Sequence, residues 1–394
     1  MLLVVLGVGV FLIFLSRERE SDLTLPAPTG PISVGRSVYD WVDEHATDPV
    51  GPPGARRELL VWMWYPAAIT PSTAMDSYWP SSLPSPANPG GDGFFSRAFE
   101  LISHNTARVH GDSYRDPAIS SAEPLYPVVI LRGGASAPVI DYSSLAEDLA
   151  SYGYVVVGLD APYRTSKVVF PDGRIISRAP ENNLELVSGE ALNHMALRLM
   201  SAWTADIAFA LDRLQQWSAP RSRGNFAGHL DMDRIGVFGH SFGGAQAAQF
   251  CSQDSRCKAG IDIDGAVFGS VIQTGMHKPF FFLMEGQGDS ASDAEVQQVV
   301  ADIQSVYDRL PPETRMRLFI QGANHFTFSD ANALLKSRIL LRALQRVKVL
   351  RLDGRRQLAI TAYCVRTFFE AHLKGTGGKP IQIRSPLYPE IQVQ

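Results

Sequence analysis

Hydrophobic and polar positions follow two different patterns along this chain, and the change falls near residue 121. Before it, residues 32–41 and 58–65 are rich in strand-forming side chains and are separated by a loop with two glycines and two prolines. These signals predict an antiparallel pair of strands. Residues 66–121 are dense in serine, proline, glycine and asparagine, with one short apolar patch at residues 94–102. An irregular insertion of this length usually covers or borders a site.

Beyond residue 121, short apolar runs alternate with long amphipathic segments, which is typical of βα units on a parallel sheet. Asp141 is expected to cap the first helix of this region, and Gly153 to stop it. The predicted fold class is α/β, with a mostly parallel central sheet, antiparallel N-terminal strands and helices on both faces. The apolar runs cover residues 126–131, 154–159, 235–238, 259–263, 279–284 and 316–320. The predicted helices cover residues 141–150, 191–217, 293–309, 330–345 and 356–373.

The N-terminal segment stands apart from this pattern. Residues 2–15 are apolar except for two glycines, and after one serine four charged residues follow at 17–20. At about 1.5 Å per residue such a helix is short for a full membrane span, so a signal-peptide core or a marginal anchor fits better. No basic region precedes the segment and no Ala-x-Ala cleavage site follows it. We expect export or membrane association through this N-terminus, and therefore a secreted or membrane-associated, extracytoplasmic location.

The domain organisation follows from these patterns. Residues 1–20 are predicted to be an apolar signal or membrane anchor, and residues 21–30 a polar, proline-bearing linker. Residues 31–394 are predicted to form a single α/β domain, with the irregular insertion at about 66–121. A chain of 394 residues with 45% hydrophobic content is long enough to bury a sizeable core.

Charge and cysteine content exclude several classes of partner. The net charge is −4, and lysines and arginines are spread thinly, so no basic face is expected to bind nucleic acid. Cys251, Cys257 and Cys364 fit no metal-ligand spacing and are too few for a disulfide framework. Cys251 and Cys257 are close enough to bridge in an oxidising compartment, but buried free thiols are the favoured interpretation. We expect no metal.

The strongest chemical signal surrounds Ser241. An apolar strand runs into Gly239-His-Ser-Phe-Gly243 and then into a run of small residues. This is the context of the nucleophile elbow of the α/β-hydrolase fold, in which glycines leave room for a strained turn that exposes the serine hydroxyl. Amides at the start of the following helix favour the oxyanion of acyl transfer. The context predicts a nucleophile at Ser241 rather than a serine that merely starts a helix.

A serine nucleophile needs a histidine to take its proton and a carboxylate to orient that histidine. The fold orders them serine, acid, histidine along the chain. Three histidines follow the serine: His277 precedes a strand, and His372 lies in the terminal helix. His325 follows the last apolar run, where the base belongs. We therefore expect His325 to be the base.

The residues leave the acid open between two strand ends. Asp264 directly follows the run at 259–263, and Asp289 follows the run at 279–284. The position of Asp289, after the penultimate strand, is the commoner place for the acid in this fold. Both positions can reach a histidine on the last loop. Asp262 has the same strand parity as Asp264 but lies deeper, so a hydrogen bond within the sheet is expected there.

The oxyanion hole of this fold takes one amide from the residue after the serine, here Phe242. The other comes from the loop after an earlier strand, and Arg132-Gly-Gly134-Ala follows the run at 126–131. Glycines there let backbone N–H groups turn towards a substrate. A flexible loop without this role is the alternative.

Taken together, these segments resemble the plasma-type platelet-activating-factor acetylhydrolases and their bacterial esterase relatives, over roughly residues 30–375. Gly-His-Ser-Phe-Gly-Gly-Ala at 239–245 resembles the family's elbow, and Arg-Cys-Lys-Ala-Gly-Ile-Asp-Ile-Asp-Gly at 256–265 its acid strand. Tyr-Pro-Val-Val-Ile-Leu-Arg-Gly-Gly at 126–134 resembles its oxyanion strand, and Val-Trp-Met-Trp-Tyr-Pro at 61–66 is also typical.

The resemblance implies the site residues. It places the acid at Asp264, 264 − 241 = 23 residues after the serine, and makes Ser241, Asp264 and His325 the catalytic triad. The amides of Gly134 and Phe242 would form the oxyanion hole. Two features depart from the family: Arg132 stands where its better-known members have histidine, and residues 66–121 have no clear match.

The implied reaction is ester hydrolysis through an acyl-enzyme, without a metal or organic cofactor. The substrate would be a phospholipid with a short or oxidised acyl chain, as for a 1-alkyl-2-acetylglycerophosphocholine esterase, or a small ester. A polyester or cutinase-like hydrolase is an alternative. A catalytically silent hydrolase-fold binding protein is another, which the complete set of triad residues disfavours. Aromatic residues of the insertion could line an acyl site, although core packing is the favoured role: Tyr78, Trp79, Phe94 and Phe95.

Overall fold

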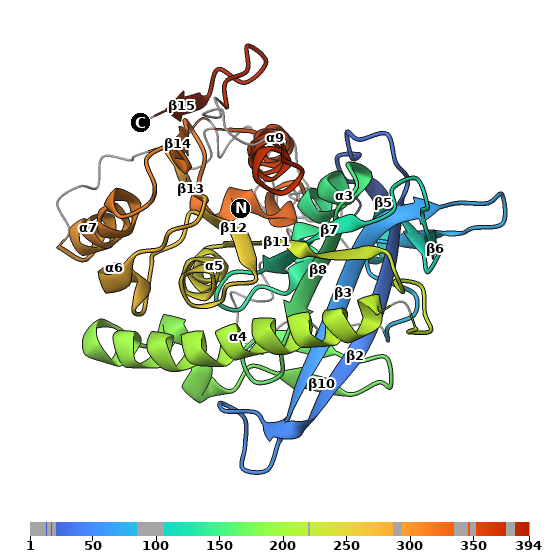
Figure 1. The fold of residues 1–394 in the computed structure, drawn as a ribbon, viewed down its shortest axis with the longest axis horizontal. Helices are drawn as coiled ribbons and strands as arrows, with labels where there is room; N and C mark the ends of the chain where they lie inside the picture. Colours follow the sequence, from blue (N-terminus) through green and yellow to red (C-terminus); the bar gives the residue numbers. More distant parts are fainter. Residues whose placement is uncertain are drawn as a thin grey trace, which may run out of the picture.

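A central β-sheet organises the computed structural model, which describes residues 21–84, 106–219, 221–286, 294–334, 352–375 and 383–393, and single positions 13, 17 and 346. Its strands follow the spatial order β1-β5-β2-β3-β8-β7-β11-β12-β13-β14-β15, with β4 beside β5 and β6 beside β3 (Figure 1). The strands are β1 (Leu23–Thr24), β2 (Val34–Thr47), β3 (Arg56–Ala68), β4 (Met75–Ser77), β5 (Val109–Arg115), β6 (Ala118–Ile119), β7 (Tyr126–Arg132), β8 (Val155–Asp160), β11 (Leu230–His240), β12 (Cys257–Ile263), β13 (Phe280–Glu285), β14 (Arg315–Ile320) and β15 (Ile391–Val393).

The strand predictions are confirmed. β2 and β3 form the expected antiparallel pair, with Val38 opposite Trp62. Each of the six later apolar runs is a strand, and β8, β7, β11, β12, β13 and β14 pair in parallel. Since parallel strands end at the same sheet edge, the loops that follow them gather there, and the candidate site residues come from those loops.

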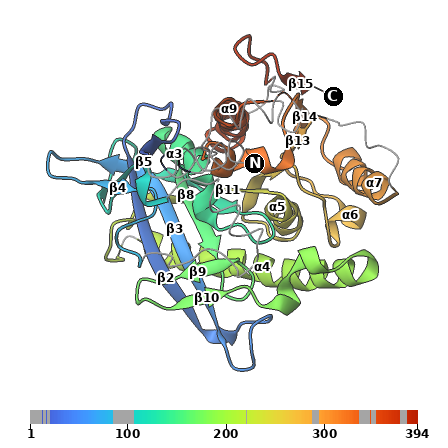
Figure 2. The same cartoon turned by 180° about the vertical axis from the view of Figure 1, so that it is seen from behind.

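Helices cover both faces of the sheet (Figures 1 and 2). One layer holds α4 (Gly189–Ser218), α5 (Phe242–Gln253), α6 (Val271–Thr274) and α7 (Ala294–Asp308). The other holds α3 (Ser143–Ser151) and α9 (Gly354–Leu373). The helices predicted at 191–217, 293–309 and 356–373 are therefore confirmed. Of the helix predicted at 330–345, the described residues include a 3-10 turn, η6 (Asp330–Asn332), and residues 335–345 lie outside them.

Alternating strand residues supply the two halves of the core. Val128 and Ile130 of β7 pack with α4 and α5, whereas Val129 and Leu131 pack with α3 and α9. Because successive side chains of a strand point to opposite faces, an uninterrupted apolar run is what a strand buried on both faces requires. The three-layer arrangement is the predicted α/β architecture.

The predicted cap of the first helix is wrong. Asp141 lies in a 3-10 turn, η2 (Val139–Tyr142), and α3 begins at Ser143 with Tyr142 at the N-cap position and no side-chain cap bond from it. A carboxylate from far along the chain takes this role, since Asp330 Oδ2 accepts a hydrogen bond from the Ser144 backbone N–H at 3.3 Å. Local sequence could not reveal a cap that comes from 186 residues away.

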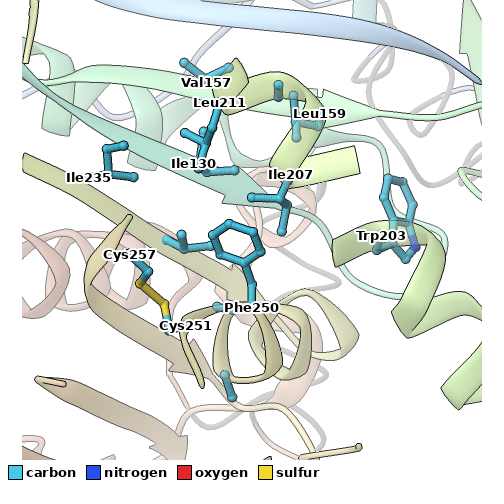
Figure 3. Close-up of a cluster of buried hydrophobic side chains, with 14 of the residues drawn as sticks. Ile130, Val157, Leu159, Trp203, Ile207, Leu211, Ile235, Phe250, Cys251 and Cys257 are labelled. Carbon is cyan, nitrogen blue, oxygen red and sulfur yellow. A yellow bond between two sulfur atoms is a disulfide. The ribbon is translucent and has the colours of Figure 1, made fainter. Parts of the chain in front are cut away.

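The interpretation of Cys251 and Cys257 as free thiols is also wrong, because the two form a disulfide with a Cα–Cα distance of 5.1 Å. The chain reverses between the end of α5 and the start of β12, which brings the two side chains together in the core (Figure 3). Cys364 is free and buried.

Most of the predicted N-terminal signal or anchor, and residues 85–105 of the insertion, lie outside the described residues. Among the helices that the structure does describe, none combines the length and apolar character needed to cross a membrane.

Candidate active site

Ser241 lies on a sharp turn between β11 and α5. Its backbone adopts φ 56° and ψ −127°, a conformation that costs a non-glycine residue of order 1–3 kcal/mol. The Ser241 N–H donates to the Ile263 carbonyl at 2.8 Å, which ties the turn to the neighbouring strand. The turn therefore exposes the hydroxyl at the sheet edge, and α5 begins at the next residue.

The glycines of the motif are required by close backbone contacts. A Cβ at Gly239 would lie 2.4 Å from the Gly243 carbonyl carbon, and one at Gly243 would lie 2.4 Å from the Gly133 carbonyl oxygen. Strand, helix and oxyanion loop thus meet at distances that admit no side chain. The same contacts bring the loop at Gly133 next to the serine.

His325 lies between Ser241 and Asp264. Its Nε2 is 3.0 Å from Ser241 Oγ, and its Nδ1 is 2.7 Å from Asp264 Oδ2. His325 begins a 3-10 turn after β14 whose N-cap, Asn324, forms a capping box with Thr327. The loop is thereby rigidly held, and the structure brings together the three residues that the sequence singled out.

The electrostatics favour a base that is held by a carboxylate. Burial lowers the pKa of His325, but the hydrogen bond and charge of Asp264, with the charge of Glu285, outweigh it, and the net effect raises the pKa above its ordinary 6.5. Burial and the charge of Asp264 in turn raise the pKa of Glu285. Its backbone N–H donates to Asp264 Oδ1 at 2.8 Å. Glu285 was not singled out from the sequence, although it directly precedes the loop that carries Asp289.

The two other candidate carboxylates have different positions. Asp262 is fully buried, as expected of a deeper position, but its Oδ1 accepts a hydrogen bond from the Gly265 N–H at 2.8 Å, so it holds the turn after β12 and the predicted bond within the sheet is wrong. Asp289, the alternative acid, lies outside the described residues.

The predicted oxyanion loop lies next to Ser241. A Cβ at Gly134 would be 3.5 Å from Ser241 Cβ. The Gly134 N–H donates to the Tyr142 hydroxyl at 3.2 Å, and that hydroxyl is 2.9 Å from His240 Nδ1. Phe242 is the first residue of α5, where amides have no partner within the helix. Tyr142 was missed at the sequence level because no motif marks it, whereas His240 lies inside the Gly-x-Ser-x-Gly motif.

Arg132, the departure from the family pattern, supports this loop from behind. Its guanidinium packs 3.4 Å from the centroid of the Trp203 ring, and its Nε donates to Gln246 Oε1 at 2.8 Å. Burial lowers the pKa of Arg132 to about 9. The side chain is thus part of the core beneath the loop.

The aromatic residues of the insertion divide between the core and the undescribed region. Tyr78 is buried, and its hydroxyl donates to the Ile140 carbonyl at 2.9 Å. Trp79 packs edge-on against Trp62. Phe94 and Phe95 lie outside the described residues. The two that are described have the core role.

A hydroxyl, an imidazole and a carboxylate joined in this order form the constellation that activates serine for acyl transfer. Within the described part of the chain, no cluster of three or more His, Cys, Asp or Glu side chains could hold a metal ion.

Comparison with known proteins gives the same class. A family model described as "Platelet-activating factor acetylhydrolase, isoform II" matches residues 222–376, a span that contains Ser241, Asp264 and His325. A probable 1-alkyl-2-acetylglycerophosphocholine esterase of Arthroderma benhamiae is 26% identical over 67% of this chain. A platelet-activating factor acetylhydrolase of Cavia porcellus is 25% identical over 52% of it. The matches span 65% and 48% of the lengths of these two relatives. The resemblance predicted from the sequence is confirmed.

A solved structure extends the likeness to nearly the whole chain. The ferulic acid esterase from Streptomyces cinnamoneus superposes with a TM-score of 0.74 and 26% sequence identity, covering 95% of this chain and 99% of that one. The chain therefore has the α/β-hydrolase fold that the elbow predicted.

Proposed function

We propose that this chain is a serine carboxylic-ester hydrolase. The observation that carries the proposal is the continuous chain of hydrogen bonds from Ser241 Oγ through His325 to Asp264, at 3.0 and 2.7 Å. These distances are within the range that proton transfer requires. The strained backbone of Ser241 supports the same assignment, because strain persists where the surrounding structure maintains it for function.

The mechanism follows from the positions of these atoms. His325 Nε2 takes the proton of Ser241 as its oxygen attacks the ester carbonyl, and Asp264 steadies the imidazolium through Nδ1. The amide of Phe242, at the start of α5, donates to the developing oxyanion. The amide of Gly134, whose N–H donates to the Tyr142 hydroxyl in the resting site, joins it by sharing its proton with the oxyanion. His325 then returns its proton to the leaving alcohol. Water, activated by the same histidine, releases the acid.

We propose phospholipids with a short or oxidised acyl chain as the substrate, with small esters as the broader class. The names of the curated relatives, platelet-activating factor acetylhydrolase and 1-alkyl-2-acetylglycerophosphocholine esterase, support the first. The ferulic acid esterase neighbour supports a second candidate, hydroxycinnamoyl esters. A panel from acetyl to long-chain esters, with and without a phosphocholine head and including methyl ferulate, separates these classes by kcat/KM.

Labelling by a fluorophosphonate probe tests the enzyme class. Wild-type protein should be labelled, and Ser241→Ala should lose both the label and all ester hydrolysis. Ser252→Ala, a change in the same helix α5, serves as the matched control and should retain both. Persistent labelling of Ser241→Ala would refute the proposal, as would a wild-type protein that neither reacts with the probe nor hydrolyses any ester.

We also propose that the protein works outside the cytoplasm. The disulfide between Cys251 and Cys257 supports this, since disulfides persist in oxidising compartments. Fractionation of producing cells tests the location, and recovery of the protein only in the cytoplasm, with reduced cysteines, would contradict it.

We propose further that residues 31–394 form one domain, because one sheet includes strands from both ends of the chain. A single calorimetric unfolding transition is expected, and two separable transitions would contradict this organisation.

A further inference from the structure

A buried chain of hydrogen bonds joins the oxyanion loop to the residue before the nucleophile. The Gly134 N–H donates to the Tyr142 hydroxyl at 3.2 Å, and the hydroxyl lies 2.9 Å from His240 Nδ1. Tyr142 is 1% exposed and His240 6%. The Tyr142–His240 bond is buried and the Gly134–Tyr142 bond partly buried, so solvent competes little for them and each bond fixes the position of its partner.

Both side chains are electrically neutral at physiological pH. Burial raises the pKa of Tyr142 above its ordinary value. Burial, with the charge of His325, lowers the pKa of His240 to about 3. Neither group is therefore suited to exchange protons during catalysis near pH 7. Their bonds serve geometry.

The same segment is anchored to the loop of the base. Tyr142 is the N-cap residue of α3, and the Ser144 N–H of that helix donates to Asp330 Oδ2 at 3.3 Å. Asp330 is fully buried and lies five residues after His325. The His240 and His325 rings are 4.6 Å apart. Oxyanion loop, nucleophile turn and base loop thus share one support.

We propose that Tyr142 is a positioning residue of the reaction. Its hydroxyl accepts the Gly134 N–H and so holds the oxyanion loop beside Ser241, and His240 fixes the hydroxyl. The N–H shares its proton with the substrate oxygen as that oxygen becomes negative, because a charged acceptor attracts the proton more strongly than a neutral hydroxyl does. Tyr142 acts through Gly134 and does not touch the substrate. This inference rests on the proposed ester hydrolysis. The Gly134 amide must be in place when the carbonyl oxygen becomes negative in the transition state. Binding of the ester in the ground state does not depend on that amide.

Tyr142→Phe tests the inference, since it removes only the hydroxyl. Losing one complete oxyanion donor typically costs about 10²–10³-fold in kcat. Losing only the support of a donor should therefore lower kcat about 10- to 100-fold. KM should stay within about twofold. The affinity for a trifluoromethyl ketone analogue of the best ester should fall by the same factor as kcat, because that compound forms the tetrahedral oxyanion. Tyr65→Phe is the matched control: it removes another buried phenol hydroxyl, which donates to the Pro117 carbonyl at 2.9 Å, and should change neither value more than about twofold.

A second variant tests the chain of bonds. His240→Gln in the Tyr142→Phe background should add little to the loss in kcat, because both changes break the same support. If His240→Gln does not fold, the kcat, KM and ketone affinity of Tyr142→Phe decide alone. Unchanged kcat and ketone affinity would overturn the inference. Raised kcat would do so as well, because it would mean that the hydroxyl competes with the substrate for the amide.

The result for Tyr142 can be distinguished from the result for the proposed ester hydrolysis. If wild-type protein hydrolyses esters and Ser241→Ala does not, the proposed function stands whatever Tyr142→Phe does. If no ester is turned over but the fluorophosphonate still labels Ser241, the labelling rate of Tyr142→Phe should fall about 10-fold or more, and an equal rate would overturn the inference. If there is no labelling either, both proposals fail together.

Discussion

The carboxylate of Asp264 reaches His325 from the end of strand β12, one strand from the nucleophile strand. Its Oδ2 lies 2.7 Å from His325 Nδ1, and its Oδ1 accepts the Glu285 N–H at 2.8 Å. Both oxygens are therefore engaged, and the backbone of Asp264, at φ 55°, is in the left-handed half of φ, as is that of Ser241. We infer that this arrangement fixes the tautomer of the base.

Replacing that carboxylate should therefore abolish most activity without unfolding the protein. Asp264→Asn should lower kcat by about 10³–10⁴-fold, because an amide no longer favours the productive tautomer or stabilises the imidazolium. Steady-state kinetics with circular dichroism as a folding check measure this. Asp289→Asn, at the alternative acid position, should keep activity. The opposite pair of results would move the acid to the loop after β13.

The pH dependence should report Glu285. Burial lowers the pKa of His325, but the hydrogen bond to Asp264 and the charges of Asp264 and Glu285 raise it above 6.5 in sum. Activity requires the neutral imidazole. Activity of the wild type should therefore fall as the pH drops through a midpoint above 6.5. Glu285→Gln removes one of the negative charges, so the midpoint of kcat/KM should move to lower pH. Gln298→Glu, a surface change in α7, should leave it in place. A midpoint that stays fixed in Glu285→Gln would contradict the coupling.

The disulfide should stabilise the domain from the core. It closes a seven-residue loop between α5 and β12, and removal of such a bridge costs about 2–4 kcal/mol. The double variant Cys251→Ala, Cys257→Ala should unfold at a correspondingly lower midpoint concentration of urea. Dithiothreitol should not change this midpoint, because no disulfide is left to reduce. Cys364→Ala, which removes a buried free thiol, should remain sensitive to the reductant. Equal stability of the double variant and the wild type would exclude this role.

Local sequence determined the strands well because their signal is local. Residues such as Val128 and Ile130 stand in runs that are buried on both faces, and such runs have few other structural solutions. The elbow was also recognisable, since Gly239 and Gly243 leave space for backbone contacts within a few residues of Ser241. What could be predicted thus depended on neighbours in sequence.

The features that were missed depend on partners far apart in the chain. Asp330 caps α3 across 186 residues, and Tyr142 meets His240 across 98. The bridge of Cys251 depends on the reversal between α5 and β12, which spacing alone allowed but did not favour. The acid was ambiguous for the same reason: from residues alone Asp264 and Asp289 were equally able to reach His325, and only the resemblance favoured Asp264.

The last prediction concerns Asp262, which shares the strand of the proposed acid but not its role. Burial, with the charge of Asp264, raises the pKa of Asp262 well above 3.8, so the folded protein favours the protonated form. A group whose pKa is raised by folding contributes stability that is present below its unfolded pKa and lost as the pH rises through its folded pKa. Asp262 alone should therefore lower the unfolding free energy by up to about 1.4 kcal/mol per pH unit above about 4, until its folded pKa is reached.

Asp262→Asn cannot ionise, and its amide oxygen can still accept the Gly265 N–H. Urea unfolding measures the free energy of unfolding of the variant and the wild type at pH 5 and pH 8. The value for Asp262→Asn minus the value for the wild type should be larger at pH 8 than at pH 5. Asp254→Asn is the control, because the pKa of Asp254 is shifted in the opposite direction. Burial raises the pKa of Asp254, but the hydrogen bonds to Arg256 outweigh burial and lower the pKa below its ordinary value. The Asp254 carboxylate therefore stays charged from pH 5 to pH 8. The loss of unfolding free energy in Asp254→Asn should be the same at pH 5 and pH 8. Because Asp262 does not touch His325, kcat of Asp262→Asn should stay within about tenfold of wild type, and a loss like that of Asp264→Asn would mean that the two carboxylates act as a unit.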